Sequence, residues 1–264
     1  MFPVALTIAG SDSGGGAGIQ ADLKTFQAFG AFGTSAITAI TVQDTRGVHG
    51  VHAIPLDVVR RQIEVVAADL EPAAVKTGML ATAELVAGVA AAIRDLRLPH
   101  YVLDPVMVAT SGDRLLDRDA ESAVTELLLP LAAVVTPNLD EARLLAGREI
   151  RGEADMRAVA ERLVEMGAAA ALVKGGHLEG GTVVDVLVDR EGARSWRRDK
   201  VATSSTHGTG CTLSAAIAAG LAHGRPLRDA VDAALDYVHR AIARAPGLGH
   251  GNGPLNHMVP ARPD

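Results

Sequence analysis

Short apolar runs alternate with amphipathic stretches along most of the chain. The runs are rich in aliphatic and β-branched residues and end at glycine, proline or polar residues, which is typical of buried strands. The stretches between them place apolar residues three and four positions apart, which predicts helices that cover a core. The predicted strands are residues 3–8, 34–43, 50–54, 73–76, 101–103, 132–135 and 170–173, followed by a hairpin of 183–188 and 193–196. The predicted helices are 19–29, 56–70, a helix capped by Thr82, 117–129, 139–145, 154–166, 212–221 and 226–242.

This repeated order of strand and helix predicts an α/β fold, with a central, mostly parallel β-sheet flanked by helices on both faces. No linker or internal repeat divides the 264 residues, so the pattern predicts a single domain over residues 1–264. Residues 247–264 are rich in glycine and proline. We expect a loose tail there, although such a segment could fold over a site.

Polar and glycine residues follow directly after the predicted strands. In sheets of this type, ligands bind beyond the carboxyl ends of the strands. The topology therefore predicts that these residues line one edge of the sheet. They are Asp12, Gln43, Thr77, Asp104, Asn138, Glu141, Lys174 and His177.

Composition narrows the class of protein. Hydrophobic residues make up 48% of the chain, which excludes a disordered protein, and aromatic residues make up only 3%, which leaves an aliphatic core. The net charge of −6 and the lack of a basic block argue against nucleic acid as a partner. The N-terminus shows no signal peptide, and no apolar stretch reaches the ~18 residues of a membrane span, so we expect a soluble, cytoplasmic protein without a membrane partner. A single cysteine excludes an intrachain disulfide framework and a cysteine-rich metal site.

The most informative stretch is residues 206–214, where Gly208, Thr209, Gly210 and Cys211 lead into a helix that begins near Thr212. The backbone N–H groups and the dipole of a helix start favour a phosphate or an oxyanion. The only cysteine lies in the first turn, where a thiolate would be stabilised. The alternatives are a simple glycine cap and a buried, inert cysteine.

A second glycine-rich loop, residues 9–18, joins the first predicted strand to the first predicted helix. The loop does not match G-x-G-x-x-G, because Ile19 stands where the last glycine would fall, and it lacks the Gly-Lys-Ser/Thr of a Walker A loop. It indicates a binding site lined by backbone, with a flexible turn as the alternative.

The remaining polar residues each allow two interpretations. Asp104 is either a carboxylate near a Mg²⁺-bound phosphate or a loop cap. Asn138 and Glu141 have the spacing of a capping box, which leaves room for a contact through metal-bound water. The Lys174 side chain either binds a phosphate or is simply exposed to solvent. We read His177 and His207 as ordinary loop histidines, and Asp22 and Lys24 as surface charges.

Taken together, these motifs resemble the ribokinase superfamily, and within it the hydroxymethylpyrimidine and phosphomethylpyrimidine kinases of thiamine biosynthesis. The resemblance covers nearly the whole chain, and a cysteine replaces the Asp that usually ends the superfamily's glycine turn. The residues that carry it are 9–25, 38–43, 76–80, 104–107, 136–138 with Glu141, 173–177 and 207–212.

This resemblance implies a ribokinase-like fold and a kinase that uses ATP and Mg²⁺. Its substrates would be 4-amino-5-hydroxymethyl-2-methylpyrimidine and then the monophosphate of that compound. It also implies a homodimer.

The resemblance further implies the roles of individual residues. Gln43 would bind the pyrimidine, because an amide offers a donor and an acceptor together. Gly208, Thr209 and Gly210 would hold the transferred phosphoryl group, and Cys211 would take the proton of the substrate hydroxyl. The other expected substrate contacts are Gly10, Asp12, Asp22, Met79 and Val106. Lys174, Asn138 and Thr206 would bind ATP, and Asp104 and Glu141 would hold Mg²⁺ through water.

Four alternatives remain open at this point. A pyridoxal or pyridoxine kinase would use the same scaffold. An NAD-dependent oxidoreductase would use the first glycine loop with Asp44 near the ribose, but the glycine spacing is wrong. A cysteine hydrolase would need glycines where Thr209 and Leu213 stand. A nucleotide-binding protein without catalysis would leave Cys211 and Asp104 without a role.

Overall fold

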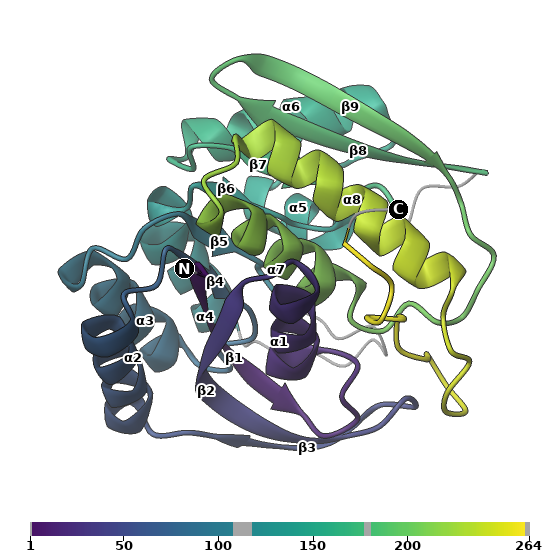
Figure 1. Cartoon of the computed structure of the whole chain (residues 1–264). Coiled ribbons are helices and arrows are strands. Elements are labelled where there is room, and N and C mark those ends of the chain that lie inside the picture. The colour runs from purple at the N-terminus through teal and green to yellow at the C-terminus, as the bar shows by residue number, and fades with distance from the viewer. Residues whose placement is uncertain (1, 108–117, 177–180, 262–264) are drawn as a thin grey trace.

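In the computed structural model, which describes residues 2–107, 118–176 and 181–261, nine strands form one sheet in the order β3-β2-β1-β4-β5-β6-β7-β8-β9 (Figure 1). The strands from β2 to β7 along this order run parallel, and β3 and β8 pair antiparallel to their neighbours at the two sides. The predicted, mostly parallel sheet is confirmed. The strands are β1 Val4–Asp12, β2 Phe32–Gln43, β3 Val48–Ala53, β4 Ala74–Thr77, β5 Tyr101–Leu103, β6 Val134–Val135, β7 Ala171–Val173, β8 Thr182–Asp189 and β9 Gly192–Asp199.

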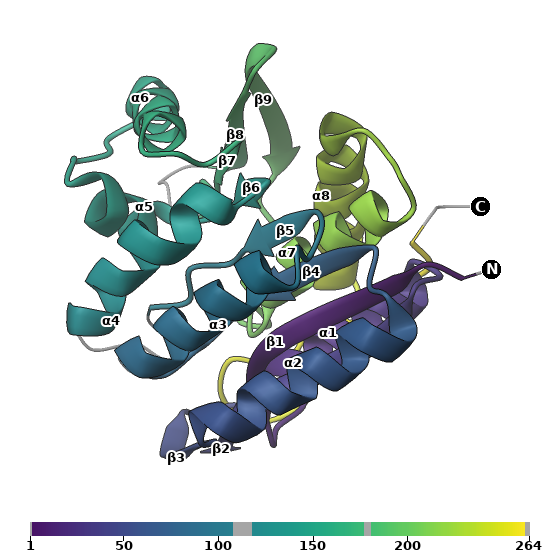
Figure 2. The ribbon, with the colours of Figure 1, turned by 90° about the vertical axis from the view of Figure 1, so that its left-hand side faces the viewer.

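The helices form a layer on each face of the sheet. Helices α1, α7 and α8 cover one face, and α2 to α6 cover the other, as the two views in Figures 1 and 2 show. The helices are α1 Gly18–Ala28, α2 Leu56–Leu70, α3 Ala83–Asp95, α4 Arg118–Ala123, α5 Leu139–Ala146, α6 Glu153–Glu165, α7 Thr209–Ala222 and α8 Leu227–Ala243.

Successive strand residues point to opposite helix layers and so build two cores. In β4, Val75 packs with the core under α2 to α6, whereas Ala74 packs with the core under α1, α7 and α8. The helix α7 is sandwiched between the sheet and its neighbours, and residues 212–221 are all buried. Close packing on several sides explains why this helix is rich in alanine, because a small side chain lets the backbones approach.

The expected helix caps are present. The hydroxyl of Thr82 accepts a hydrogen bond from the Leu85 N–H at 3.2 Å at the start of α3. The expected helix over 117–129 differs, because α4 changes into a π-helical turn, Val124–Leu128, and a 3₁₀ turn, Leu129–Leu131. Pro130 lacks an N–H and cannot continue an α-helix. The predicted first residue of that helix, Asp117, lies outside the described residues.

Residues 247–249 of the tail are exposed and irregular, whereas residues 250–261 are held against the rest of the domain. Leu255 and Val259 are buried in the core beside α8. The Thr45 hydroxyl, in the turn between β2 and β3, accepts hydrogen bonds from the N–H groups of His250 at 3.1 Å and Gly251 at 3.2 Å. Two apolar residues thus anchor a segment that is otherwise rich in glycine and proline. The tail lies across the carboxyl edge of the sheet.

None of the helices in the described part of the chain combines the length and the apolar character needed to cross a bilayer.

Candidate active site

Asp12, at the end of β1, organises the first glycine loop. Its carboxylate accepts hydrogen bonds from the backbone N–H groups of Gly14 at 2.8 Å, Gly16 at 3.0 Å and Ala17 at 2.8 Å. The Nε2 atom of His207 lies 2.9 Å from the same carboxylate. Burial alone would raise the pKa of Asp12, but His207 and the loop amides hold the pKa below its ordinary value. The loop is therefore folded around an ionised carboxylate, and the predicted contact of Asp12 with a substrate stays a prediction.

The turn before α7 has the shape of an anion site. Gly208 is the N-cap of α7 with φ +83°, a conformation that favours glycine. Among the described residues no side chain caps this helix; the Thr209 N–H donates to the Thr206 carbonyl at 3.3 Å, and the N–H groups of Gly210 and Cys211 are placed to meet an anion. The hydroxyl of Thr209 donates to the carbonyl of Thr206 at 2.7 Å and fixes the turn. A Cβ on Gly208 would overlap the carbonyl oxygen of Gly16, so the two glycine loops are in direct contact.

Asp104 and Lys174 meet beside this turn, although they follow different strands. Lys174 Nζ lies 3.4 Å from Asp104 Oδ1, and the Ser214 hydroxyl donates to Asp104 Oδ2 at 3.1 Å. A Cβ on Gly210 would lie 3.1 Å from Lys174 Nζ and 3.7 Å from each Asp104 carboxylate oxygen. Val106, which follows Asp104, is half-buried. Residues from β5, β7 and α7 thus converge at one edge, as the topology predicted.

Glu141 adds a second carboxylate to this cluster. It forms the capping box of α5 with Asn138. The Asn138 N–H donates to the Glu141 carboxylate at 2.8 Å, and the Glu141 N–H donates to the side-chain oxygen of Asn138 at 2.9 Å. Burial raises the pKa of Glu141 to about 7, with Lys174 opposing the shift and the charge of Asp104 adding to it. Two carboxylates share one lysine, so negative charge is incompletely balanced here.

A divalent cation would relieve this imbalance, and carboxylate oxygens are ligands that Mg²⁺ accepts. Within residues 2–107, 118–176 and 181–261, however, no three His, Cys, Asp or Glu side chains gather closely enough to hold a metal alone. The residues present therefore fit Mg²⁺ when water and phosphate oxygens complete its coordination, since Mg²⁺ usually keeps several waters.

Cys211 lies half-buried in the first turn of α7. Burial raises the pKa of its thiol to about 12; Lys76 opposes the shift, and Asp22 and Asp104 add to it. A hydrogen bond from the Gly18 backbone also lowers the pKa. The lowering that a helix start gives is outweighed by burial. At neutral pH the sulfur of the free protein therefore carries its proton.

Gln43 lies at the end of β2, with its side chain between two polar neighbours. Its Oε1 atom accepts a hydrogen bond from the Thr41 hydroxyl at 3.0 Å, and its Nε2 atom lies 3.4 Å from His207 Nε2. Met79 lies close to Gly10, where a Cβ would be 3.0 Å from the Met79 methyl carbon. The residues predicted to line a substrate pocket are thus brought to the same edge as the anion turn. Their contact with a substrate stays a prediction.

Asp22 is not the surface charge that we expected. It is fully buried, and its carboxylate lies 2.8 and 2.9 Å from Lys76 Nζ and accepts the Thr7 hydroxyl at 2.6 Å. Burial lowers the pKa of Lys76, but the charge of Asp22 more than offsets this, and the pKa lies above its ordinary value. The signal that we missed is a lysine inside the apolar run 73–76, which needs a buried partner. Lys24, in contrast, is exposed, as expected.

His207 was also misjudged as an ordinary loop histidine. Its ring is buried against Asp12, and its backbone N–H donates to the carbonyl of Gly253 in the tail at 3.1 Å. The signal was its position directly before Gly208. The other loop histidine, His177, lies outside the described residues.

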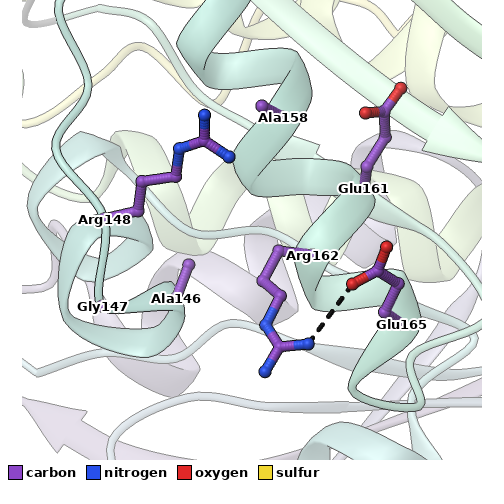
Figure 3. A pocket seen from close by; sticks show the side chains of 7 residues that line it. All are labelled: Ala146, Gly147, Arg148, Ala158, Glu161, Arg162 and Glu165. Atoms are coloured by element: carbon purple, nitrogen blue, oxygen red, sulfur yellow. Dashed lines mark hydrogen bonds and ion pairs between the residues drawn. The ribbon is translucent and has the colours of Figure 1, made fainter.

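A separate hollow lies between α5 and α6 (Figure 3). It opens at the C-terminal end of α5, whereas Asn138 and Glu141 stand at the N-terminal end of that helix. The Arg162 and Glu165 side chains form an ion pair at 3.3 Å along its α6 wall. The hollow brings together none of the predicted site residues. Its lining residues are Ala146, Gly147, Arg148, Ala158, Glu161, Arg162 and Glu165.

Comparison with known proteins shows to which family the chain belongs. The family model described as phosphomethylpyrimidine kinase matches residues 12–256, from the first carboxylate of the glycine loop to the tail. The chain belongs to this family. The prediction of a kinase of this family is confirmed, and the alternative of an NAD-dependent oxidoreductase gains no support.

Several family members are similar over nearly the whole length of this chain. The hydroxymethylpyrimidine/phosphomethylpyrimidine kinase of Rhizobium meliloti is 54% identical over 98% of both chains. The enzyme of that name from Bacillus subtilis is 46% identical over 97% of this chain and 94% of its own. A bifunctional thiamine biosynthesis protein of Geobacter sulfurreducens is 48% identical over 97% of this chain and 52% of its own.

Solved structures show the same fold. The ADP complex of Bacillus subtilis pyridoxal kinase is 40% identical, covers 97% of this chain and 98% of its own, and gives a TM-score of 0.92. The phosphomethylpyrimidine kinase of Clostridium difficile is 41% identical, covers 92% of this chain and all of its own, and gives a TM-score of 0.82. The ribokinase-like fold predicted from the motifs is therefore confirmed.

Proposed function

We propose that the protein uses ATP and Mg²⁺ to phosphorylate 4-amino-5-hydroxymethyl-2-methylpyrimidine, and then phosphorylates the monophosphate to the diphosphate, in thiamine biosynthesis. The observation that carries the proposal is the convergence of the anion turn, Lys174 and Asp104 beside Gln43 at one edge of the sheet. The names of the similar proteins support it.

The residues of the turn can position and stabilise a transferred phosphoryl group. Phosphoryl transfer demands alignment and charge stabilisation more than covalent work by the protein. The first-turn amides of α7 offer fixed N–H donors, and the Lys174 ammonium adds a positive charge within reach of Gly210. We infer that Asn138 and Thr206 contact ATP, because both flank this cluster. Complexes of related pyridoxal kinases with ADP and AMP-PCP support the use of ATP.

Asp104 and Glu141 are the residues that would hold Mg²⁺, in part through water. The ion would offset negative charge on the phosphates. The raised pKa of Glu141 supports this assignment, because a cation there would favour the ionised carboxylate.

We propose that Cys211 takes the proton from the substrate hydroxyl. Its sulfur lies at the start of the helix whose amides form the anion site. The half-buried thiol must first release its own proton to solvent water, and the positive charge of Lys76 favours this loss. A cation at Asp104 would offset the carboxylate charge that opposes it.

We also infer that the protein acts in the cytoplasm as a homodimer. Ile40 and Val42, on one face of β2, are 48% and 63% exposed. Exposed apolar neighbours of this kind favour burial against a second copy. Light scattering after size-exclusion chromatography would give the mass of one chain if this inference is wrong.

The proposed reaction is tested by ADP release with a panel of alcohols. We expect turnover with the hydroxymethylpyrimidine and with its monophosphate, and weaker turnover with pyridoxal and pyridoxine. Ribose is the negative control. Release with pyridoxal alone would favour a pyridoxal kinase, as in the 40% identical structural relative.

The contact between the two glycine loops gives a separate prediction. Gly208→Ala should lower kcat/KM by about 10²-fold or more, because the new Cβ would displace the turn from Gly16 and misplace the phosphoryl group. Gly224→Ala is the matched control, since Gly224 also has a positive φ, of +73°, but faces open space. The control should lose stability by about 1–2 kcal/mol and keep its kinetics. Equal kinetic losses in the two variants would contradict the argument.

A further inference from the structure

The tail contacts the chain on both sides of the anion turn, residues 208–211. Directly before the turn, the backbone N–H of His207 donates to the carbonyl of Gly253 at 3.1 Å. Directly after the turn, the hydroxyl of Thr212 lies 2.9 Å from the Nε2 atom of His257, which follows 45 residues further along the chain. The tail therefore holds both ends of the turn whose N–H groups face the site.

The hydroxyl of Thr212 is the donor in the second of these contacts. Thr212 is fully buried, and a buried hydroxyl needs a protein partner for its hydrogen. In the part of the chain that the structure describes, the His257 ring is the one hydrogen-bond partner of this hydroxyl. A threonine inside a helix often donates to the carbonyl four residues back, which here is the carbonyl of Gly208. That carbonyl accepts the backbone N–H of Thr212 at 2.9 Å, and the hydroxyl points to the tail instead.

The ring of His257 can accept this hydrogen because it is neutral. Burial lowers the pKa of His257 to about 4, and the charge of Lys24 adds to the shift, so the ring carries one hydrogen at neutral pH. The backbone carbonyl of Leu255 is the other hydrogen-bond partner of the ring and opposes the shift. A carbonyl can only accept, so the ring hydrogen lies on Nδ1 and faces Leu255. Nε2 is left with a lone pair for Thr212.

We propose that Thr212 and His257 are positioning residues for phosphoryl transfer, because their hydrogen bond clamps the end of the anion turn to the tail. The inference rests on the proposed function, in which the N–H groups of Gly210 and Cys211 hold the transferred group. The Thr209 hydroxyl fixes the start of the turn, and the Thr212–His257 clamp fixes its end. Donors that stabilise a transition state act only when they are held in place, so a loosened turn should slow the transfer.

Thr212→Val tests the clamp, because valine keeps the shape of threonine but has no hydrogen to donate. The kcat with Mg-ATP should fall about 10- to 50-fold, and His257→Leu should cause the same fall. The KM for the hydroxymethylpyrimidine should stay within about twofold, because Gln43 is not touched. Thr212→Ser keeps the donor and His257→Gln keeps an acceptor, so both should stay within about threefold of the parent kcat. Conservative variants as slow as Thr212→Val would overturn the clamp.

A double variant and a matched control separate the clamp from general loosening of α7. Thr212→Val combined with His257→Leu should be no slower than the slower single variant, because the same hydrogen bond is lost only once. His223 is the control, because its Nε2 atom lies 2.9 Å from the Phe29 carbonyl at the other end of α7. His223→Leu should keep the parent kcat. Equal kcat losses in His223→Leu and Thr212→Val, or additive losses in the double variant, would overturn the clamp.

Hydrogen exchange separates this inference from the proposed function. The N–H of Thr212, which bonds to Gly208, should exchange about fivefold faster or more in His257→Leu than in the parent. Unchanged exchange would overturn the clamp whatever the substrate is. If the parent releases ADP with neither the hydroxymethylpyrimidine nor its monophosphate, the proposed function fails, and exchange still decides whether the clamp holds the turn. If the parent turns over both and Thr212→Val matches its kcat, only the inference fails.

Discussion

Replacing Cys211 with alanine should lower kcat about 10²- to 10⁴-fold, the range of a lost proton acceptor, with little change in the KM for ATP. The half-buried thiol is small, so the fold should tolerate the change. Steady-state kinetics with Mg-ATP and the hydroxymethylpyrimidine measures the loss. Activity near that of the parent would end the assignment of Cys211 as the base.

Two further measurements distinguish proton transfer from packing. Cys211→Ser restores the volume, but a hydroxyl is a far weaker acid than the thiol, so its kcat should stay low. In the parent, kcat should rise with pH between about 7 and 9, because burial raises the thiol pKa to about 12 and the ionised fraction grows throughout this interval. The serine variant should lose this slope. A serine variant with parent kcat and slope would show that the sulfur only fills space.

Removing Lys76 should cause the largest loss of stability. Lys76→Met leaves the carboxylate of Asp22 buried without its cation, which costs about 3–5 kcal/mol in free energy of unfolding. Urea unfolding followed by circular dichroism measures the loss. A change below about 1 kcal/mol would mean that Asp22 takes up a proton or is reached by water without penalty.

Two controls accompany this prediction. Asp22→Asn combined with Lys76→Met removes both charges and keeps an acceptor for the Thr7 hydroxyl, so most of the lost stability should return. Arg157→Met breaks the exposed pair with Glu161, which has a similar separation of 2.9 Å, and should cost less than about 1 kcal/mol. Equal losses in Lys76→Met and Arg157→Met would show that burial does not govern the effect.

Thr82 and Asn138 show how far local sequence determines this structure. Each side chain caps a helix by accepting a hydrogen bond from the N–H three residues further on. Neighbouring residues alone therefore determine where these helices begin. The same holds for the alternation of strand residues between two cores, which follows from the period of a strand. The edge at which the site forms was predictable for the same reason, because parallel strands end together.

Contacts between distant residues were not predictable in this way. Asp22 and Lys76 are 54 residues apart, and Asp12 and His207 are 195 apart. Each pair depends on how α1 and α7 pack on the sheet, and spacing along a chain does not encode that packing. The anchoring of the tail was missed because two apolar residues, Leu255 and Val259, outweigh the flexible composition around them.

The position of the tail ties the active site to the order in which the chain is synthesised. Asp12 and Gln43 leave the ribosome early, and N-terminal segments generally fold first. His207 is held by Gly253, and the turn after Gln43 is held by residues 250–252. The site therefore closes only after these late residues have emerged. A chain whose translation stops before them carries most of the sheet but an unfinished site, so premature termination should yield an inactive protein rather than a slower enzyme.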